Sequence, residues 1–288
     1  VSADAVVFLV NHGIICKQNK VYQSAREALE LAVECKSKIA SSNDPLFVTI
    51  YKALGEVLQE LRLFEEGEKY FFKALKVKEV NLGRDHPDCI PLYFNIADFY
   101  QAASKNREAL EFLQKALEIS KAKNGEESNR TAEVFFNLGE YYYKLKKNEE
   151  ALDSFLRAFR IYDTNNENKK IAYVYDYLGS LYKIKGELEK AVSYYRLSVK
   201  NREITAGKNS LDYAKSLNNL ASIYLMQDNN EAEMFLKESL KVCESVLGQK
   251  HPSLAPILNN LIHYYRKNNN NAELENYQKR FESLNSVT

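Results

Sequence analysis

The residues whose side chains could carry out catalysis or bind a metal ion are few and scattered. The four Cys and four His stand alone in the sequence, at Cys16, Cys35, Cys89, Cys243, His12, His86, His251 and His263. No two Cys form a CxxC pair and no His lies at zinc-ligand spacing, so we expect neither a metal site nor a disulfide framework. The sequence also lacks a nucleophile elbow, a phosphate-binding glycine loop and an HExxH motif. We therefore predict a protein that is not an enzyme and needs no cofactor.

Two other groups of residues could act as acids or bases, but their positions favour structural roles. The carboxylate pairs Glu65-Glu66 and Glu149-Glu150 follow turns and precede helical segments, where the positive end of a helix favours acidic residues. His86 and His251 each precede Pro in equivalent connections, which predicts that they cap helices. None of these residues needs a catalytic explanation.

Composition and charge exclude several classes of protein. Of 288 residues, 40 are Lys or Arg and 39 are Asp or Glu, which gives a net charge of +1. This balance offers no electrostatic excess for binding nucleic acid or an anionic membrane surface. No run of eighteen apolar residues could cross a membrane, and a hydrophobic fraction of 45% is too high for a disordered chain. We expect a folded, soluble, cytoplasmic protein without nucleic-acid or membrane partners.

A repeat of 40 to 42 residues runs through the whole sequence. Each copy carries a small or pivotal residue at its eighth position, at Gly13, Gly55, Ala97, Gly139, Gly179, Ala221 and Ile262. In most copies a second small residue follows eleven or twelve positions later, and Leu or an aromatic residue comes four positions after that. Apolar residues recur every three or four positions, and the chain has only ten Gly and five Pro. This pattern predicts antiparallel helix hairpins throughout. Repeats starting near 6, 48, 90, 132, 172, 214 and 255 would stack to bury their apolar stripes.

The repeat residues resemble the tetratricopeptide repeat over essentially the whole chain. Leu138-Gly139, Tyr142, Ala151 and Phe155 illustrate the pattern. The 42-residue unit is similar to the kinesin light chain subgroup, whose mark is a Gly-x-x-His-Pro connection leading to an Asn-Asn-Leu helix. Residues 83–87 and 248–252 carry the connection, and residues 218–220 and 259–261 carry Asn-Asn-Leu. The resemblance implies an all-α fold, a right-handed α-superhelix (solenoid) of about seven repeats.

The resemblance also implies that positions 2, 5, 6, 9, 12 and 13 of each first helix line a concave groove. Position 6 is Asn in five of the seven copies, at Asn11, Asn95, Asn137, Asn219 and Asn260. The Asn-Asn-Leu motifs add Asn218 and Asn259 beside this row. An amide both donates and accepts hydrogen bonds, so such a row can pair with the backbone of an extended peptide without demanding one sequence.

Other groove positions predict a direction for the ligand. Acidic residues such as Glu56 and Glu140 dominate the second to fourth copies, whereas the later copies contribute basic residues at Lys183, Lys215 and Arg266. The aromatic side chains expected between the two ends include Phe136, Tyr173 and Tyr177. They could form an anchor pocket for an apolar side chain of the ligand. Packing against neighbouring helices is an equally good explanation for any one of them.

These features predict a protein interaction scaffold or adaptor whose groove binds extended, partly acidic segments of partner proteins. Cytoskeletal, motor-associated or ciliary assemblies are the expected setting. One alternative is a permanent structural component of a large complex that uses its convex surface and ends, and a second is a peptide-sensing regulator. We expect residues 1–288 to form a single array that is a segment of a larger protein. Its uncapped ends are expected to pack against other chains.

Overall fold

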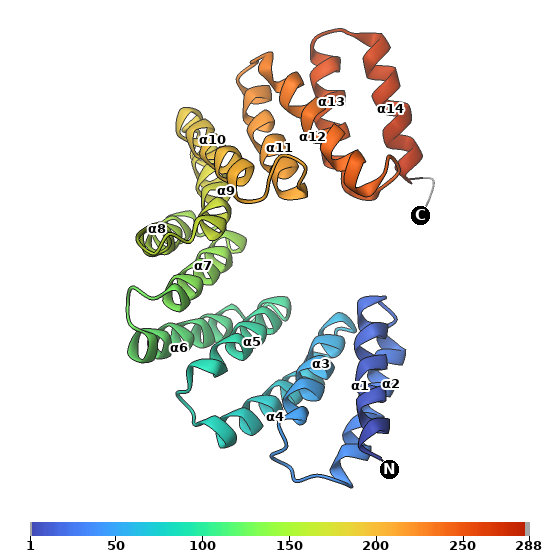
Figure 1. Ribbon diagram of the computed structural model, residues 1–288, viewed down its shortest axis with the longest axis vertical. Coiled ribbons are helices and arrows are strands. Elements are labelled where there is room, and N and C mark those ends of the chain that lie inside the picture. The colour runs from blue at the N-terminus through green and yellow to red at the C-terminus, as the bar shows by residue number, and fades with distance from the viewer. Residues whose placement is uncertain (1, 286–288) are drawn as a thin grey trace. The chain divides into compact units, whose positions relative to one another are not determined.

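The computed structural model describes residues 2–285 and consists of helix hairpins from end to end (Figure 1). Among the described residues no β-strand is present, so the predicted all-α helical-repeat class is confirmed. The chain divides into two compact units, residues 1–137 (unit 1) and 138–288 (unit 2), and the division falls within α7.

Unit 1 contains three complete hairpins. Its helices are α1 (Ala3–Gln18), α2 (Tyr22–Ser37), α3 (Leu46–Glu60), α4 (Phe64–Leu82), α5 (Ile90–Ala102), α6 (Asn106–Asn124) and the first part of α7 (Asn129–Lys144). The two helices of each hairpin pack together, α2 packs on α3, and the short 3-10 helix η1 (Pro87–Cys89) leads into α5. The second helix of one repeat therefore contacts the first helix of the next, as the predicted stacking of repeats requires.

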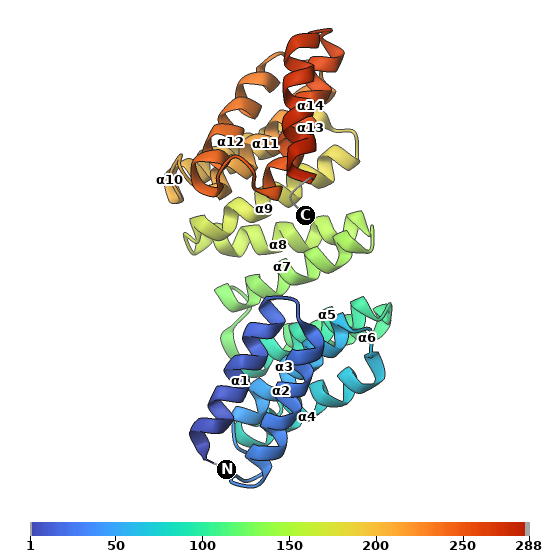
Figure 2. The same cartoon turned by 90° about the vertical axis from the view of Figure 1, so that its right-hand side faces the viewer.

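Unit 2 continues the same order of hairpins. Its elements are the remainder of α7, α8 (Asn148–Thr164), α9 (Asn168–Ile184), α10 (Leu188–Thr205), α11 (Leu211–Met226), α12 (Glu231–Leu247), η2 (Pro252–Leu254), α13 (Ala255–Lys267) and α14 (Asn271–Asn285). The paired helices of the last hairpin, α13 and α14, lie side by side in Figure 1 and overlap in the view of Figure 2. The observed hairpins begin within four residues of the predicted starts.

The small residues of the repeat lie where two helices cross, as predicted. A Cβ atom added to Gly139 would lie 2.7 Å from the Phe155 ring, and one added to Gly179 would lie 2.9 Å from the Tyr195 ring. Ala151, the second small residue of its repeat, is fully buried. Close approach of the two helix backbones therefore depends on these positions having little or no side chain.

The turn inside each hairpin has one residue in the left-handed conformation. These residues are Lys20, Arg62, Ser104, Lys146, Gly186, Asp228 and Asn269, with φ between 53° and 78°. The backbone N–H of the next residue then donates to the carbonyl five positions back, as from Lys147 to Tyr142 at 2.9 Å. This bond closes the C-terminal turn of the first helix in the manner of a Schellman motif.

The histidines that precede proline act as predicted. The backbone N–H of Asp88 donates to His86 Nδ1 at 3.2 Å, and that of Ser253 donates to His251 Nδ1 at the same distance. Each imidazole therefore caps a short 3-10 helix that begins at Pro87 or Pro252. The equivalent geometry in the two units explains why the connection recurs in the sequence.

Candidate functional site

The predicted site residues all lie on the first helices of their repeats. In unit 1 these are Asn95 on α5 and Phe136 and Asn137 on α7. The residues in unit 2 are Tyr173, Tyr177 and Lys183 on α9, Lys215, Asn218 and Asn219 on α11, and Asn259, Asn260 and Arg266 on α13. Because α9 and α13 both pack against α11, the first helices of unit 2 form one continuous face. We call this the first-helix face of unit 2.

Three members of the asparagine row already have hydrogen-bond partners within the chain. Asn260 Nδ2 donates to Asn218 Oδ1 at 2.9 Å, Asn137 Nδ2 donates to the Glu133 carbonyl at 2.7 Å, and Asn95 Nδ2 has a long contact of 3.4 Å with Glu56 Oε1. Each bond uses only part of what an amide offers, since it carries two N–H donors and an acceptor oxygen. The row is thus partly satisfied internally, which the sequence does not reveal.

Asn219 and Asn259 are placed differently from these three. Asn219 is half-buried on α11 and Asn259 is exposed on α13. Neither side chain makes a hydrogen bond with any residue between 2 and 285. These two amides therefore keep their full capacity for an external ligand on the first-helix face of unit 2.

Tyr177 takes the place of asparagine in its repeat and is mainly a packing residue. Its ring stacks on the Phe155 ring at 4.6 Å and meets the Tyr143 ring edge-on at 5.4 Å. Its hydroxyl donates to Glu140 Oε1 at 2.6 Å. Burial, together with that bond, raises the pKa of Tyr177 well above its usual range. Packing, which the sequence left as an equal alternative, accounts for this residue.

Tyr173 belongs to a buried polar network that the sequence analysis missed. Arg202 on α10 is only 2% exposed, and its Nη2 lies 2.7 Å from Asp176 Oδ2 on α9. The Tyr173 ring covers the guanidinium group at 5.0 Å, and the Tyr173 hydroxyl donates to Asp212 Oδ2 on α11 at 3.2 Å. The network therefore ties three consecutive helices of unit 2 together.

Ser198 completes this network. Its hydroxyl donates to Asp176 Oδ1 at 2.7 Å and accepts a bond of 3.2 Å from Arg202 Nη1. Arg202 Nη2 is close to Asp176 but is not aligned for a hydrogen bond, so that contact is electrostatic. A signal was present in the sequence, because an acidic residue at groove position 5 and an arginine in the second helix occur together in this repeat only.

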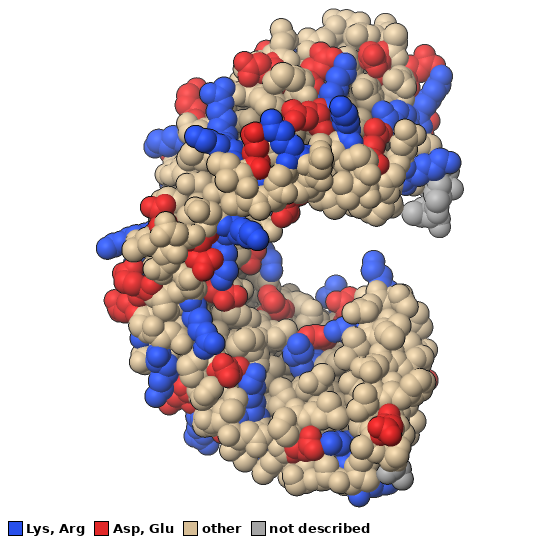
Figure 3. All heavy atoms as spheres, viewed as in Figure 1, with Lys and Arg blue, Asp and Glu red and all other residues tan. Residues whose placement is uncertain are grey.

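The three predicted basic site residues lack internal ion-pair partners, whereas Lys267, also on α13, pairs with Asp228. Lys183 is half-buried, Lys215 and Arg266 are exposed, and none of them forms an ion pair with a residue that the structure describes. By contrast, Glu56 in unit 1 pairs with Lys17 and also lies 3.8 Å from Lys52. Elsewhere acidic and basic residues are interspersed over the surface in view (Figure 3). The three cations are therefore available to an acidic ligand.

Comparison with known proteins identifies the family. The sequence profile of the tetratricopeptide repeat matches residues 46–122, 88–164 and 170–242, which is more than half of the chain. The chain belongs to the tetratricopeptide repeat family. No curated protein sequence matches it.

Several solved structures have similar folds. BtubC (BKLC) from P. vanneervenii is 20% identical, with a TM-score of 0.61 over 86% of this chain and 94% of that one. A putative kinesin light chain repeat protein from Podosopora anserina is 17% identical, with a TM-score of 0.57 over 70% and 98%. A Rap protein complexed with Competence and Sporulation Factor is 17% identical, with a TM-score of 0.56 over 100% and 76%. At these identities the likeness concerns the fold alone.

The side chains that could bind metal ions are scattered over the described residues. Within residues 2–285 no three His, Cys, Asp or Glu side chains gather as a metal-ion site. All four Cys are free thiols, and burial raises the pKa of Cys89 and of Cys243. No helix in that range combines the length and the hydropathy needed to span a membrane. The tetratricopeptide repeat fold is generally an interaction scaffold.

Proposed function

We propose that this tetratricopeptide repeat protein is a non-enzymatic adaptor that binds an extended, partly acidic segment of a partner protein along its first helices. The observation that carries the proposal is the set of three unpaired cations beside two unbonded amides on the first-helix face of unit 2. Amides can pair with the ligand backbone whatever its sequence, and the cations favour carboxylates. The groove therefore supplies affinity through the backbone and preference through charge.

The proposed setting is a cytoplasmic assembly of the cytoskeleton, a motor or a cilium. The support for it is the Gly-x-x-His-Pro and Asn-Asn-Leu motifs and a fold similar to that of kinesin light chain repeats. A peptide-sensing regulator is the second candidate, since a Rap protein of similar fold was crystallised with Competence and Sporulation Factor. The two candidates share a peptide-binding groove and differ in what binding controls.

The groove is tested with peptides selected from a displayed library for binding to the full chain. Replacing Asn219 and Asn259 by Ala should remove at least two hydrogen bonds of about 0.5–1.5 kcal/mol each and weaken binding at least several-fold. Arg266→Glu should weaken peptide binding more at low salt than at high salt, because the new carboxylate repels the acidic peptide and salt screens that repulsion. Affinities are measured by calorimetry at two salt concentrations.

The matched control for Arg266 is Lys241→Glu, since Lys241 is exposed on the second helix α12 and forms no ion pair within the described part of the chain. This variant should bind like the wild type. Selected peptides whose affinity depends on Lys241 but not on Arg266 or the two asparagines would contradict the groove proposal.

A permanent structural role is supported by a separate observation on α1. Phe8 and Ile15 are 68% and 53% exposed, on a face of α1 that no described helix covers. Residues at the position of Phe8 in the other repeats are all at most 4% exposed, namely Ile50, Leu92, Val134, Val174, Ser216 and Ile257. In α3 the corresponding face packs on Ala25 and Leu29 of α2. Another helix could cover α1 in the same way.

The structural role has its own test. Phe8→Asp with Ile15→Asp should leave peptide binding by the groove unchanged, because neither residue lies at a groove position. If the protein serves as a structural component, the same double variant should fail to enter the assembly from which wild type is purified. Incorporation of the variant at the wild-type level would rule out a role for this face.

A further inference from the structure

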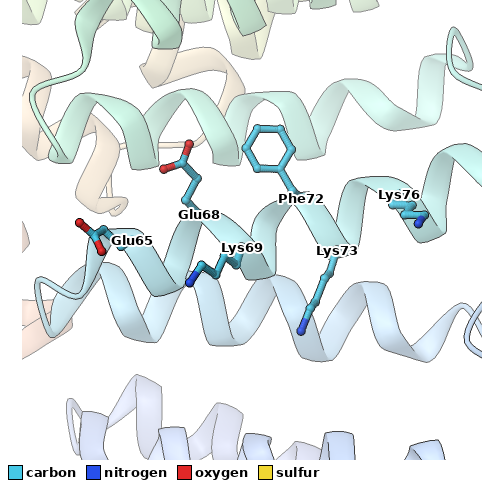
Figure 4. Close-up of a pocket in the computed structure, with 6 residues that line it drawn as sticks. All are labelled: Glu65, Glu68, Lys69, Phe72, Lys73 and Lys76. Carbon is cyan, nitrogen blue, oxygen red and sulfur yellow. The ribbon is translucent and has the colours of Figure 1, made fainter.

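The outer face of α4 carries a shallow depression of about 650 Å³ in unit 1 (Figure 4). It is lined by one helix, through Glu65, Glu68, Lys69, Phe72, Lys73 and Lys76. These side chains recur every three or four residues, which puts them on one stripe of the helix. We call this set the α4 stripe. It lies on a second helix and is separate from the first-helix face proposed as the groove.

Phe72 is the apolar centre of the α4 stripe. Its side chain is 42% exposed, and its ring lies 6.1 Å from the Phe112 ring on α6. One edge of the ring is thus supported by a neighbouring helix while much of the rest faces water. Covering an exposed aromatic face is favourable, at roughly 25 cal/mol per Å² of apolar surface removed from water.

Two unpaired lysines flank this ring along the helix. Lys69 and Lys76 form no ion pair with any residue from 2 to 285, and they lie on either side of Phe72, about 10 Å apart along the axis. Lys73 points its ammonium group over the Tyr70 ring at 4.9 Å, which leaves its charge without a carboxylate. The centre of the stripe is therefore positively charged.

The two glutamates of the stripe do not cancel these charges. Glu68 is already engaged, since it accepts a hydrogen bond of 2.7 Å from the Tyr100 hydroxyl and pairs with Lys105 at 3.2 Å. Glu65 lies at the N-terminal end of the helix, one turn before Lys69. Its carboxylate would repel a polyanion that extends along the whole stripe. A short acidic ligand that contacts only Lys69 to Lys76 would avoid this repulsion.

The same repeat position in other second helices lacks this combination. On α8 it is Leu156, 39% exposed, but the neighbouring Arg157 pairs with Asp153 at 2.9 Å. On α6 it is Gln114, and the adjacent Lys115 lies 3.6 Å from Glu79. The α4 stripe is therefore more than the ordinary solvated face of a second helix.

We propose that the α4 stripe is a second docking surface, which binds an acidic protein segment carrying an apolar side chain. The apolar side chain covers Phe72, and carboxylates before and after it pair with Lys69 and Lys76. The choice of an acidic partner rests on charge complementarity, because three cations without carboxylate partners surround one exposed ring. An adaptor with two such surfaces can hold two partner segments at once.

The test uses the full chain and a fluorescein-labelled peptide of roughly a dozen residues. It has one Leu at its centre and one Glu on each side of it, with the two Glu residues about 10 Å apart to match the spacing of the lysines. A twin peptide has Ser in place of Leu. By fluorescence anisotropy, Lys69→Glu with Lys76→Glu should weaken binding about tenfold or more, as expected when two ion pairs become repulsions. Phe72→Ser should weaken it several-fold and remove the preference for the Leu peptide.

The matched control is on α8, Leu156→Ser with Arg160→Glu, at the positions equivalent to Phe72 and Lys76, and this variant should bind the peptide like the wild type. Arg266→Glu should also leave it unchanged, so this result is independent of the groove proposal. Circular dichroism checks that each variant keeps its helical content. If the double charge reversal on α4 unfolds the protein, the neutral variant Lys69→Gln with Lys76→Gln is tested in its place. The proposal would be overturned if the α4 and α8 variants lost the same affinity, if the two peptides bound equally well, or if neither bound. Preferential binding of anionic vesicles or single-stranded DNA would overturn it too.

Discussion

Single glycines and aromatic rings set how closely the helices of a hairpin approach. Gly55 faces the Phe71 ring, Gly139 faces Phe155 and Gly179 faces Tyr195, each at a distance that a methyl group could not occupy. These rings are at most 3% exposed, so they have little room to move aside. At this scale the fold depends on which atoms are absent as much as on which are present.

Replacing Gly179 by Ala should destabilise the protein although alanine is the better helix former. The helix-propensity gain is about 1 kcal/mol, but the added methyl would lie 2.9 Å from two carbons of the Tyr195 ring. That ring is held in place by a 2.8 Å bond between its hydroxyl and Ser180 Oγ. Overpacking of this kind costs about 1–3 kcal/mol, so we expect a net loss of up to about 2 kcal/mol in urea unfolding.

The control for this substitution is Gly179→Ala combined with Tyr195→Leu. The smaller side chain makes room for the methyl, so adding Gly179→Ala should cost less in the Leu background than in the wild type. A wild-type or higher urea midpoint for Gly179→Ala alone would show that the crossing is not as tight as described.

Tyr195 should also make stability depend on pH in alkaline solution. Burial raises its pKa to about 12, whereas an unfolded tyrosine titrates near pH 10. Between these values the unfolded state loses its proton first, so the free energy of unfolding falls as pH rises from about 10 towards 12. The contribution is intact below pH 10, and for about two pKa units it amounts to roughly 3 kcal/mol.

The measurement is urea unfolding at pH 8, 10 and 11.5 for wild type and Tyr195→Phe. Phe cannot ionise, so the variant should lose less stability between pH 10 and 11.5 than the wild type. Other buried tyrosines still titrate, hence part of the decline remains. Identical pH profiles for the two proteins would refute this assignment to Tyr195.

Between elements, the Asp176–Arg202 pair links α9 to α10 and is reinforced by Ser198. Two charges with side chains 13% and 2% exposed are costly to remove from water, and their attraction offsets that cost only while both are present. The Tyr173 ring over the guanidinium group extends the network to α11. We therefore interpret this network as an interaction that fixes the packing of α9, α10 and α11 rather than as a ligand-binding site.

Asp176→Asn should therefore destabilise the protein strongly, by about 3–5 kcal/mol, because it leaves a buried guanidinium group without its counter-charge. The double change Asp176→Leu with Arg202→Met should cost less than Asp176→Asn alone, since no buried charge is left. Denaturant unfolding of the set measures the coupling. Simple additivity of the single changes, Asp176→Leu and Arg202→Met, would mean that the pair is not coupled as the distances indicate.

Over the whole molecule, stability should be distributed repeat by repeat. Each hairpin contacts mainly its neighbours along the sequence, as α10 contacts α11 and α12 contacts α13. Such arrays unfold in segments, and their terminal repeats open most easily. That the seven repeats form a single domain remains a prediction.

Tyr277→Ala tests this distribution. Tyr277 is 7% exposed and stacks on the Tyr265 ring at 5.5 Å, so its loss should open the last hairpin, α13 and α14. Amide hydrogen exchange should accelerate at least tenfold in these two helices, because their free energy of local opening falls by about 1.4 kcal/mol or more. The exchange rates in α3 and α4 should remain nearly unchanged. A uniform acceleration over all helices would instead indicate one global cooperative unit.

The sequence by itself determined the helix hairpins, their starts to within four residues and the small residues at the crossings. It could do so because a 3.6-residue period, a small residue beside a large one and a Pro after a cap are all visible in local spacing. The 40- to 42-residue recurrence then identified equivalent positions even in weaker copies. Four of the seven left-handed turn residues are Lys, Arg or Ser, however, so their residue types carried no signal of this backbone conformation.

Only the tertiary structure decided which candidate side chains are available to a ligand. Tyr177 stacks on a ring 22 positions earlier, and Asn260 bonds to Asn218, 42 positions earlier. Position in a repeat predicts which way a side chain faces but not which partner reaches it from the next helix. Partner choice depends on distances of a few tenths of an ångström between chemically similar groups. The same reason explains why the buried Arg202 network and the unpaired lysines of α4 became evident only in three dimensions.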